Sequence, residues 1–430
     1  MSANAAPIRT FTGPQGPGSS HVAFSNSDAQ FLYKTLYPQG IDQEALVRNK
    51  PLMQWVDNDP DFTTGKNMEI PAAYVNPQGI GSTNANAAAN EVGSKGVMFQ
   101  VPQRHTIALG ALDADVVRNT KAGGDASQFT DMLQAQVDGI TEAIGTEVHQ
   151  RMYGDNTAVR SFLSATGAIN TTTFYLANAE DCQFYEPNMK IVLVNPATGA
   201  ARVGTAVTIT SVDVDNGALI CSGNPNSFTS AAAGDGIARS TMVGADMDGL
   251  KAWCPVSVGP SDSFMGVNRS VYRTRLAGVY YDASGKPIRT GFINALAKAK
   301  AQVGSMFERK SPFFINPKNL AQIVQSVEST RVTTGAIEDK YGIGLETIDV
   351  FGHKFVEDAL CPVNTAWLIG QNALVRATAG KQPQLDDQDG NQFWYNRRTG
   401  QLEFVLAHDG NIAALEAYNV MQVTLPNQAL

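Results

Sequence analysis

The segment at residues 311–327, SPFFINPKNLAQIVQSV, constrains the fold more than any other part of the sequence. Its first part is a short apolar strand at residues 313–315, which must stop at Asn316-Pro317 because proline has no N–H to continue a hydrogen-bond ladder. Pro317 suits the first turn of a helix, with Asn316 as the N-cap. The apolar residues that follow recur at helical spacing and predict one buried face: Leu320, Ile323, Val324 and Val327.

A glycine-centred pair of strands follows this helix. Residues 345–351 and 355–356 are predicted as strands on either side of Gly352-His353-Lys354, and residues 367–370 (WLIG) as a later strand. The segment GVNRS lies upstream at residues 266–270. This order of elements resembles the central domain of tailed-phage major capsid proteins of the Hong Kong 97 type. The resemblance implies a shell-building subunit and not an enzyme.

The resemblance covers nearly the whole chain in element order, apart from the first 27 residues and an insertion. It implies an α+β fold of the Hong Kong 97 type with an all-β insertion domain. The expected parts are an N-terminal arm at 1–60, an extended β-hairpin loop at 61–110, a peripheral domain at 111–163 and 371–430 with a spine helix at 127–152, an insertion domain at 164–246 and an axial domain at 247–370.

Composition narrows the function classes. A chain of 430 residues is too long for one ordinary core, so two or three domains are expected. Its formal net charge of −8 argues against tight sequence-independent binding to DNA, although an acidic chain can line a DNA container. The four cysteines, Cys182, Cys221, Cys254 and Cys361, are scattered and are expected to be small buried side chains. No apolar run reaches the ~18 residues of a membrane span, and the N-terminus has no secretory signal, so folding in cytosol is expected.

The N-terminal third is predicted to be extended. Residues 1–27 are rich in Gly, Pro, Ser and Ala and indicate a mobile arm, and residues 28–37 suggest a short amphipathic helix. Residues 68–75 are predicted as one strand, with residues 97–101 and 106–109 as its partner. Between them, residues 76–96 have almost no apolar side chains. Because an isolated two-stranded ribbon is marginal in water, this hairpin should lie on something else, which in the resembled family is the neighbouring subunit.

The clearest helix is predicted at residues 125–153. An apolar stripe runs along its whole length, with Asp125 or Ser127 as the cap and Gly154 as the stop: Phe129, Leu133, Val137, Ile140, Ile144, Val148 and Met152. The position matches the spine helix of the resembled family.

Residues 164–246 have the pattern of a small all-β unit. Short β-rich runs at 174–176, 190–194, 207–212 and 218–221 are separated by turns such as Asp215-Asn216-Gly217. The segment contains seven carboxylates and three cations, Lys190, Arg202 and Arg239, so its net charge is −4. We expect an independently folded unit whose two ends lie close together.

The remaining elements are predicted as follows. Residues 264–270 form a strand region, and residues 290–307 form a helix with Ile293, Leu296, Val303 and Phe307 facing inward. Residues 401–407 and 412–425 are two long strands joined at His408-Asp409-Gly410.

Motifs for catalysis or cofactor binding are missing from the sequence. There is no phosphate-binding P-loop, and Gly285-Lys286 is followed by Pro287, which lacks both the hydroxyl and the N–H that such a loop needs. There is also no dinucleotide-binding glycine motif and no G-x-S-x-G. The sequence therefore predicts no catalytic, cofactor-binding or metal-binding residues, and no cofactor is expected.

Several weaker patterns receive ordinary interpretations. The histidines His21, His105, His149, His353 and His408 are isolated in sequence and are expected to be surface or core imidazoles rather than zinc ligands. Residues 386–391 (DDQDGN) fail as a calcium loop and are predicted as a solvated turn. Arg269, Arg273 and Arg275 form a basic cluster, interpreted as inter-subunit salt bridges or a solvated face. The resemblance also raises a lysine–asparagine cross-link assisted by a glutamate. Lys66 and Lys95 lie on or near the extended loop, but no asparagine or glutamate can be matched.

The resemblance implies a major capsid protein that self-assembles as hexamers and pentamers into an icosahedral shell enclosing double-stranded DNA of a tailed phage. The alternatives are an encapsulin-like cellular compartment, or a non-viral β-rich enzyme or adhesin. The expected partners are copies of the same chain, a portal and a separate scaffolding protein, with or without a decoration protein. The expected location is the virion capsid, assembled in the host bacterial cytoplasm, with no membrane partner.

Overall fold

The computed structural model describes residues 50–59, 67–113, 126–165, 171–304, 311–328, 349–350, 353–380, 382–386, 392–396, 398 and 401–427. The chain divides into two compact units. Within the described residues, the first unit contains His105–Val148 and Thr378–Asp409, and the second contains Lys50–Arg104, His149–Ala377 and Gly410–Leu430. The arm and short helix predicted at residues 1–37 lie outside the described residues.

The first unit packs a sheet against one long helix. Its strands are β4 (Arg104–Asp113), β19 (Gln384–Leu385), β20 (Phe393–Asn396) and the first part of β21 (Gln401–Ala414), and its helix is α6 (Ala126–Tyr153). The other three strands all pair with β21, along which Leu402, Phe404 and Leu406 are buried at every second position. A Cβ at Gly110 of β4 would overlap the side chains of Phe404 and Ile140. The glycine therefore allows β4, β21 and α6 to approach closely.

The long helix confirms the prediction for residues 125–153. α6 has 28 residues and is roughly 42 Å long at a rise of 1.5 Å per residue. Val137, Ile144 and Val148 of the predicted stripe are buried. The N–H of Gly154 donates to the carbonyl of Arg151 at 3.0 Å, where the helix ends.

Two predictions about strand pairing are wrong. Residues 106–109 do not pair with the hairpin: they belong to β4, which pairs with β21. The chain leaves the hairpin at Pro102, the last residue of β3 (Lys95–Pro102), where proline offers no N–H for further pairing.

The turn predicted at His408-Asp409-Gly410 does not exist, because β21 runs unbroken through these residues to Ala414. His408 is buried, and Asp409 accepts an N–H from Ala379 at 3.0 Å, so packing and sheet pairing override the local turn signal. The break comes later, at the 3-10 helix η6 (Ala417–Asn419), before β22 (Val420–Thr424).

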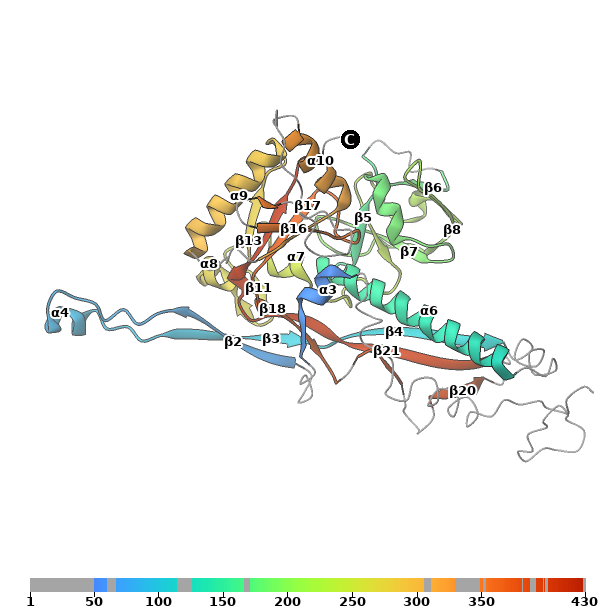
Figure 1. The fold of residues 1–430 in the computed structure, drawn as a ribbon, viewed down its shortest axis with the longest axis horizontal. Helices are drawn as coiled ribbons and strands as arrows, with labels where there is room; N and C mark the ends of the chain where they lie inside the picture. The colour runs from blue at the N-terminus through green and yellow to red at the C-terminus, as the bar shows by residue number, and fades with distance from the viewer. Residues whose placement is uncertain are drawn as a thin grey trace, which may run out of the picture. The chain divides into compact units, whose positions relative to one another are not determined.

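A six-stranded mixed sheet organises one part of the second unit. Its order is β13-β22-β17-β14-β16-β15, with bounds β13 Val279–Asp282, β14 Phe313–Ile315, β15 Asp349–Val350, β16 His353–Glu357 and β17 Thr365–Ile369. β14 lies between an antiparallel neighbour, β17, and a parallel neighbour, β16. The helices α9 (Ile288–Val303) and α10 (Pro317–Glu328) lie against this sheet (Figure 1).

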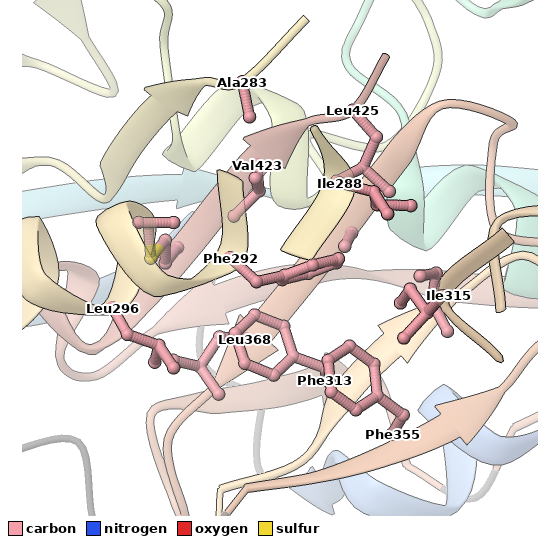
Figure 2. Packing of buried hydrophobic residues seen from close by; sticks show 14 of the residues in the cluster. Ala283, Ile288, Phe292, Leu296, Phe313, Ile315, Phe355, Leu368, Val423 and Leu425 are labelled. Atoms are coloured by element: carbon pink, nitrogen blue, oxygen red, sulfur yellow. The ribbon is translucent and has the colours of Figure 1, made fainter. Parts of the chain in front are cut away.

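An aromatic cluster forms the centre of the core between the sheet and α9. The rings of Phe313 and Phe355, on neighbouring strands, stack with centroids 5.0 Å apart. Phe292 of α9 contacts both rings edge-on, at 5.3 and 5.1 Å. Figure 2 shows the three rings together with Leu296 and Leu368. All of these side chains are buried. Phe314 is buried as well, so the apolar run at residues 313–315 is a strand, as predicted, and both of its faces are covered.

The start of α10 also confirms its prediction. The Asn316 side chain accepts the N–H of Lys318 at 3.0 Å, which is an N-cap bond. Its amide nitrogen donates to the carbonyl of Cys361 at 2.9 Å. Leu320 and Ile323 are buried, and Val324 is half-buried.

The inward face predicted for α9 is partly wrong. Ile293 is 36% exposed, whereas Phe292, Ala295 and Ala299 are buried together with Leu296. The small Ala side chains let the helix lie close to the sheet, and this places Phe292 in the aromatic cluster. Phe307 lies outside the described residues.

The second unit also contains a six-stranded β-barrel. The strand order is β5-β10-β7-β8-β9-β6, with bounds β5 Val159–Phe162, β6 Thr173–Tyr175, β7 Lys190–Val194, β8 Val207–Asp213, β9 Ala218–Cys221 and β10 Gly236–Arg239. A bridge between Leu163 and Leu176 joins the two ends of this sheet, and the N–H of Ser164 donates to the carbonyl of Tyr175 at 2.8 Å. The sheet is therefore closed around its own apolar core, which includes Phe174, Leu193, Ile209 and Leu219.

The chain enters and leaves the barrel at one place. The N–H of Gly244 donates to the carbonyl of Asn156 at 2.9 Å, so the ends lie close together, as expected. β5 lies before residue 164 and pairs with β10.

The remaining elements of the second unit are short. They are the helices α3 (Pro51–Trp55), α4 (Asn84–Ala89), α7 (Leu250–Trp253) and α8 (Arg273–Leu276), the 3-10 helices η2 (Ala179–Phe184), η3 (Pro225–Ser227) and η4 (Arg269–Val271), and the strands β1 (Asp57–Asp59), β2 (Asn67–Val75), β3, β11 (Ser263–Phe264), β12 (Val267–Asn268) and β18 (Leu374–Thr378). β1 pairs in parallel with β18, and the guanidinium of Arg376 donates to the carbonyl of Val56 at 3.2 Å. No helix among the described residues is long and apolar enough to cross a membrane.

We expect Val137→Asp to prevent stable folding of the first unit. Val137 is 1% exposed, and an unpaired buried carboxylate should lower the free energy of unfolding by about 3 kcal/mol or more. Gln136→Asp places the same charge at the neighbouring exposed position and should be tolerated. Soluble yield and thermal unfolding of both variants measure this. Wild-type stability of Val137→Asp would contradict the packing of α6.

We expect the barrel to fold on its own when residues 156–245 are expressed alone. Its sheet is closed and its core consists of barrel side chains with few from outside, so little apolar surface should be exposed by excision. Amide NMR spectra should show dispersed resonances. Collapsed, poorly dispersed spectra would mean that the barrel needs the rest of the second unit.

Candidate functional site

The hairpin formed by β2 and β3 is the clearest candidate for a contact surface. The two strands pair from Asn67 opposite Pro102 to Val75 opposite Lys95, which confirms residues 68–75 and 97–101 as partners. Figure 1 shows them as a two-stranded ribbon with α4 at its far end. Among the described strands, neither pairs with a third. Ribbons of this kind are marginally stable alone in water, so packing at the base must hold it.

The base of the hairpin is fixed by aromatic packing. Phe99 is 1% exposed, and its ring contacts those of Trp253 at 5.2 Å and Phe264 at 6.5 Å. The N–H of Gln100 donates to the carbonyl of Met265 at 2.9 Å. Along the ribbon only Ile70, Phe99 and Val101 are buried apolar residues. The anchored part of the hairpin is therefore its base.

The tip of the hairpin is held only by local hydrogen bonds and leaves apolar side chains exposed. Thr83 caps α4 by accepting the N–H of Asn86 at 3.2 Å. The N–H of Gln78 donates to the carbonyl of Val92 at 3.0 Å across the ribbon. Ile80 is 77% exposed. Covering this aliphatic side chain with another surface would remove apolar area from water and would be favourable.

A buried carboxylate joins the end of α6 to the segment at residues 358–361. Asp358 accepts a hydrogen bond from the Tyr153 hydroxyl at 2.7 Å, and the same oxygen lies 2.6 Å from Nε2 of His149. All three groups are buried. Burial alone would raise the pKa of Asp358, but the hydrogen bond and charge of His149, together with the Tyr153 hydroxyl, hold it below its ordinary value. Asp358 is therefore ionised near neutral pH.

The same segment also contacts the barrel. The side-chain amide of Gln183 in η2 donates to the carbonyl of Ala359 at 2.5 Å, and Leu360 packs against the apolar core of the barrel. Nearby, Lys318 at the start of α10 forms an ion pair of 2.8 Å with Glu180. Burial raises the pKa of Asp181, next to this ion pair, to about 7.

The prediction of a solvated face or of inter-subunit salt bridges at Arg269, Arg273 and Arg275 is wrong for Arg269, which is buried and paired within its own chain. Arg269 is 4% exposed, forms an ion pair with Asp262 at 2.6 Å and lies over the Phe264 ring at 4.2 Å. Burial explains the difference, because a buried guanidinium needs a counter-charge and acceptors from its own chain. Arg273 donates to the carbonyls of Pro255 and Val256.

The other side chains singled out in the sequence have ordinary surroundings. The four cysteines are free and buried, as predicted. His149, His353 and His408 are buried, and Nδ1 of His105 lies 2.6 Å from a carboxylate oxygen of Asp409. Within the described part of the chain no three His, Cys, Asp or Glu side chains are grouped so that they could hold a metal ion. Lys66, His21 and most of the segment at 386–391 lie outside the described residues.

Comparison with known proteins identifies the fold. No protein-family model and no curated protein sequence matches the chain. The capsid asymmetric unit of cyanophage A-1(L) matches with a TM-score of 0.51 at 13% identity, over 88% of this chain and 93% of that chain. A structure from Gordonia phage Cozz covers 97% of this chain and 99% of its own at 12% identity, with a TM-score of 0.41. The SrpI encapsulin of Synechococcus elongatus PCC 7942 covers 89% and 90% at 8% identity, with a TM-score of 0.42.

The match to the cyanophage structure extends over most of both chains. The chain therefore has a mixed α/β fold of the phage-capsid type. This agrees with the fold that the strand–helix order at residues 311–370 predicted.

We expect Asp358→Asn to destabilise the second unit by about 3–5 kcal/mol at pH 7, because it removes one partner of a buried charged pair. The folded-state pKa of Asp358 lies below the unfolded value of about 3.9. Its contribution to stability is therefore complete above the unfolded pKa and is lost as the pH falls through the folded pKa. The stability gap between wild type and variant should narrow below about pH 4.

Thermal and urea unfolding between pH 7 and pH 3 measure this gap. Asp215→Asn, at an exposed position of the barrel, is the matched control and should change little. A gap that stays constant down to pH 3 would show that the Asp358 charge does not support the fold.

Proposed function

We propose that the chain is the major capsid protein of a tailed phage. Copies assemble as hexamers and pentamers into an icosahedral shell that encloses double-stranded DNA. The observation that carries this proposal is the fold, which is shared with a phage capsid subunit over most of both chains. The role is structural and not enzymatic.

The Hong Kong 97 layout explains the separate parts of the chain. The N-terminal arm comprises residues 1–60, the extended loop 61–110, and the peripheral domain 111–163 and 371–430 around the spine helix. The axial domain comprises residues 247–370 and is built on the aromatic core. Residues 164–246 are the insertion domain, and the closed barrel supports this assignment together with β5, which extends it to residue 159.

The exposed tip of the hairpin fits an extended loop that lies across the neighbouring subunit. Ile80 and Met98 are 77% and 56% exposed and would be covered there. Each such contact is weak alone, but a closed shell adds many of them. The net charge of −8 keeps free subunits apart until enough contacts form.

The partners under this proposal are copies of the chain, a portal and a separate scaffolding protein, with or without a decoration protein. Assembly takes place in the host bacterial cytoplasm, and the final location is the virion capsid. No observation favours an encapsulin-like compartment, which would enclose protein cargo in place of DNA.

We expect purified protein, or protein co-expressed with its scaffold, to form closed particles of megadalton mass. Electron microscopy and sedimentation measure this.

Hydrogen exchange at residues 76–96 should be fast in free subunits and slow in particles, because the hairpin tip becomes covered. Particles in which these residues exchange as fast as in the free subunit would contradict the role of the hairpin. A chain that stays monomeric under all assembly conditions would contradict the proposed function itself.

A further inference from the structure

A groove of about 400 Å³ lies between the hairpin and the segment that leads into α8. Tyr74 and Lys95, at the far ends of the paired parts of β2 and β3, line one side. Tyr272 and Arg275 line the other side. The groove thus joins two parts of the chain that are distant in sequence, and its cations come from both.

The charges of this groove are unbalanced. Lys95 and Arg275 are cations, and among the described residues no carboxylate lines the groove. The Arg275 guanidinium lies over the Tyr418 ring at 5.4 Å, and Tyr418 in turn contacts Glu416, so Arg275 is partly balanced by its own chain. Lys95 is exposed and has no ion pair with another described residue. A carboxylate from another molecule would therefore pair with a cation that forms no ion pair with the described residues of its own chain.

The rest of the lining suits a protein surface. The amide side chains of Asn76 and Gln78 can donate hydrogen bonds to carboxylate oxygens. Val271 is 59% exposed and Tyr272 is 44% exposed beside the cations. Tyrosine and arginine, here Tyr74, Tyr272 and Arg275, are enriched at protein–protein contacts.

We propose that this groove binds carboxylate side chains of a second copy of this chain. The inference rests on the proposed function, because a shell brings copies into repeated contact. The chain has 40 Asp and Glu residues against 32 Lys and Arg, so a second copy is rich in the matching charge. A nucleic acid is a weaker candidate, because a net charge of −8 repels a polyanion. The apolar side chain of Val271, beside the cations, also offers no hydrogen bond to a phosphate.

Zero-length cross-linking tests the contact directly. Particles are assembled from an equal mixture of ¹⁴N- and ¹⁵N-labelled chains and treated with a water-soluble carbodiimide. This reagent condenses a lysine amine with a carboxylate only where the two touch. We expect the Lys95 peptide joined to an Asp or Glu peptide with mixed isotope labels, which proves a link between copies. A Lys95 that is unlinked, or linked only within its own copy, overturns the proposal.

Charge reversal provides the second measurement. Lys95→Glu should raise the protein concentration needed for half-maximal assembly about tenfold or more, and Lys95→Gln should have a smaller effect. Lys300→Glu makes the same change at an exposed position of α9 outside the groove and should assemble like wild type. Circular dichroism confirms that the variants fold. Equal assembly of Lys95→Glu and Lys300→Glu overturns the proposal.

The outcomes separate the possible failures. If the wild-type chain forms no particles, the proposed function fails and the groove proposal fails with it. If particles form but Lys95 is protected from amine labelling only when they contain DNA, the groove holds phosphate and the carboxylate proposal is wrong.

Discussion

The second unit depends on one buried carboxylate. Asp358 is surrounded by protein, yet it stays ionised because His149 and Tyr153, one helical turn apart on α6, both place polar hydrogens on it. An ion removed from water in this way is costly unless it is paired, so its geometry admits little variation. The end of the long helix is thereby fixed to the segment at residues 358–361. This segment also accepts the Asn316 amide that fixes the start of α10.

The barrel is attached to the same segment. Gln183 donates to the carbonyl of Ala359, and Leu360 packs against the barrel core. The two residues after Asp358 therefore restrain the barrel, which the chain otherwise enters and leaves through two linking segments. Three parts of the chain, the helix end, the barrel and the aromatic-cored sheet, therefore share one short loop. A closed barrel has no free sheet edge, which means that its attachment must come from side chains such as these and not from strand pairing. Precise placement of an inserted domain within a subunit would matter for any assembly in which copies repeat.

Local chemistry in the sequence predicted much of the fold. The bounds of β7 and β9 agree with the predicted runs residue for residue, and the N-cap at Asn316 is where proline and asparagine chemistry places it. Pairing between distant segments could not be predicted in this way. β4 joins β21 across nearly 300 residues of sequence, and no local pattern encodes that choice. The pair of His149 and Asp358 was missed for the same reason, since the two residues are 209 positions apart and each looks ordinary alone. On α9, Ile293 and Phe292 are equally apolar, and only the aromatic cluster decides which of them faces inward.

One of the two candidate contact surfaces, the hairpin tip, was predictable from the sequence because it lacks apolar side chains that could be buried within its own chain. A ribbon whose buried apolar side chains lie only at its base, and whose tip exposes Ile80, does not contain the interactions needed to order it. The bland composition of residues 76–96 indicated this from the sequence. The groove at Lys95 was not predictable, because its cations come from segments 180 residues apart. Both features have the same physical origin. Apolar surface that is exposed, and charge that is unpaired, in a single copy would lower the free energy of association when a second copy covers them. Under the proposed assembly, one cation without an ion pair among the described residues, Lys95, would select where a neighbouring copy of this acidic chain binds.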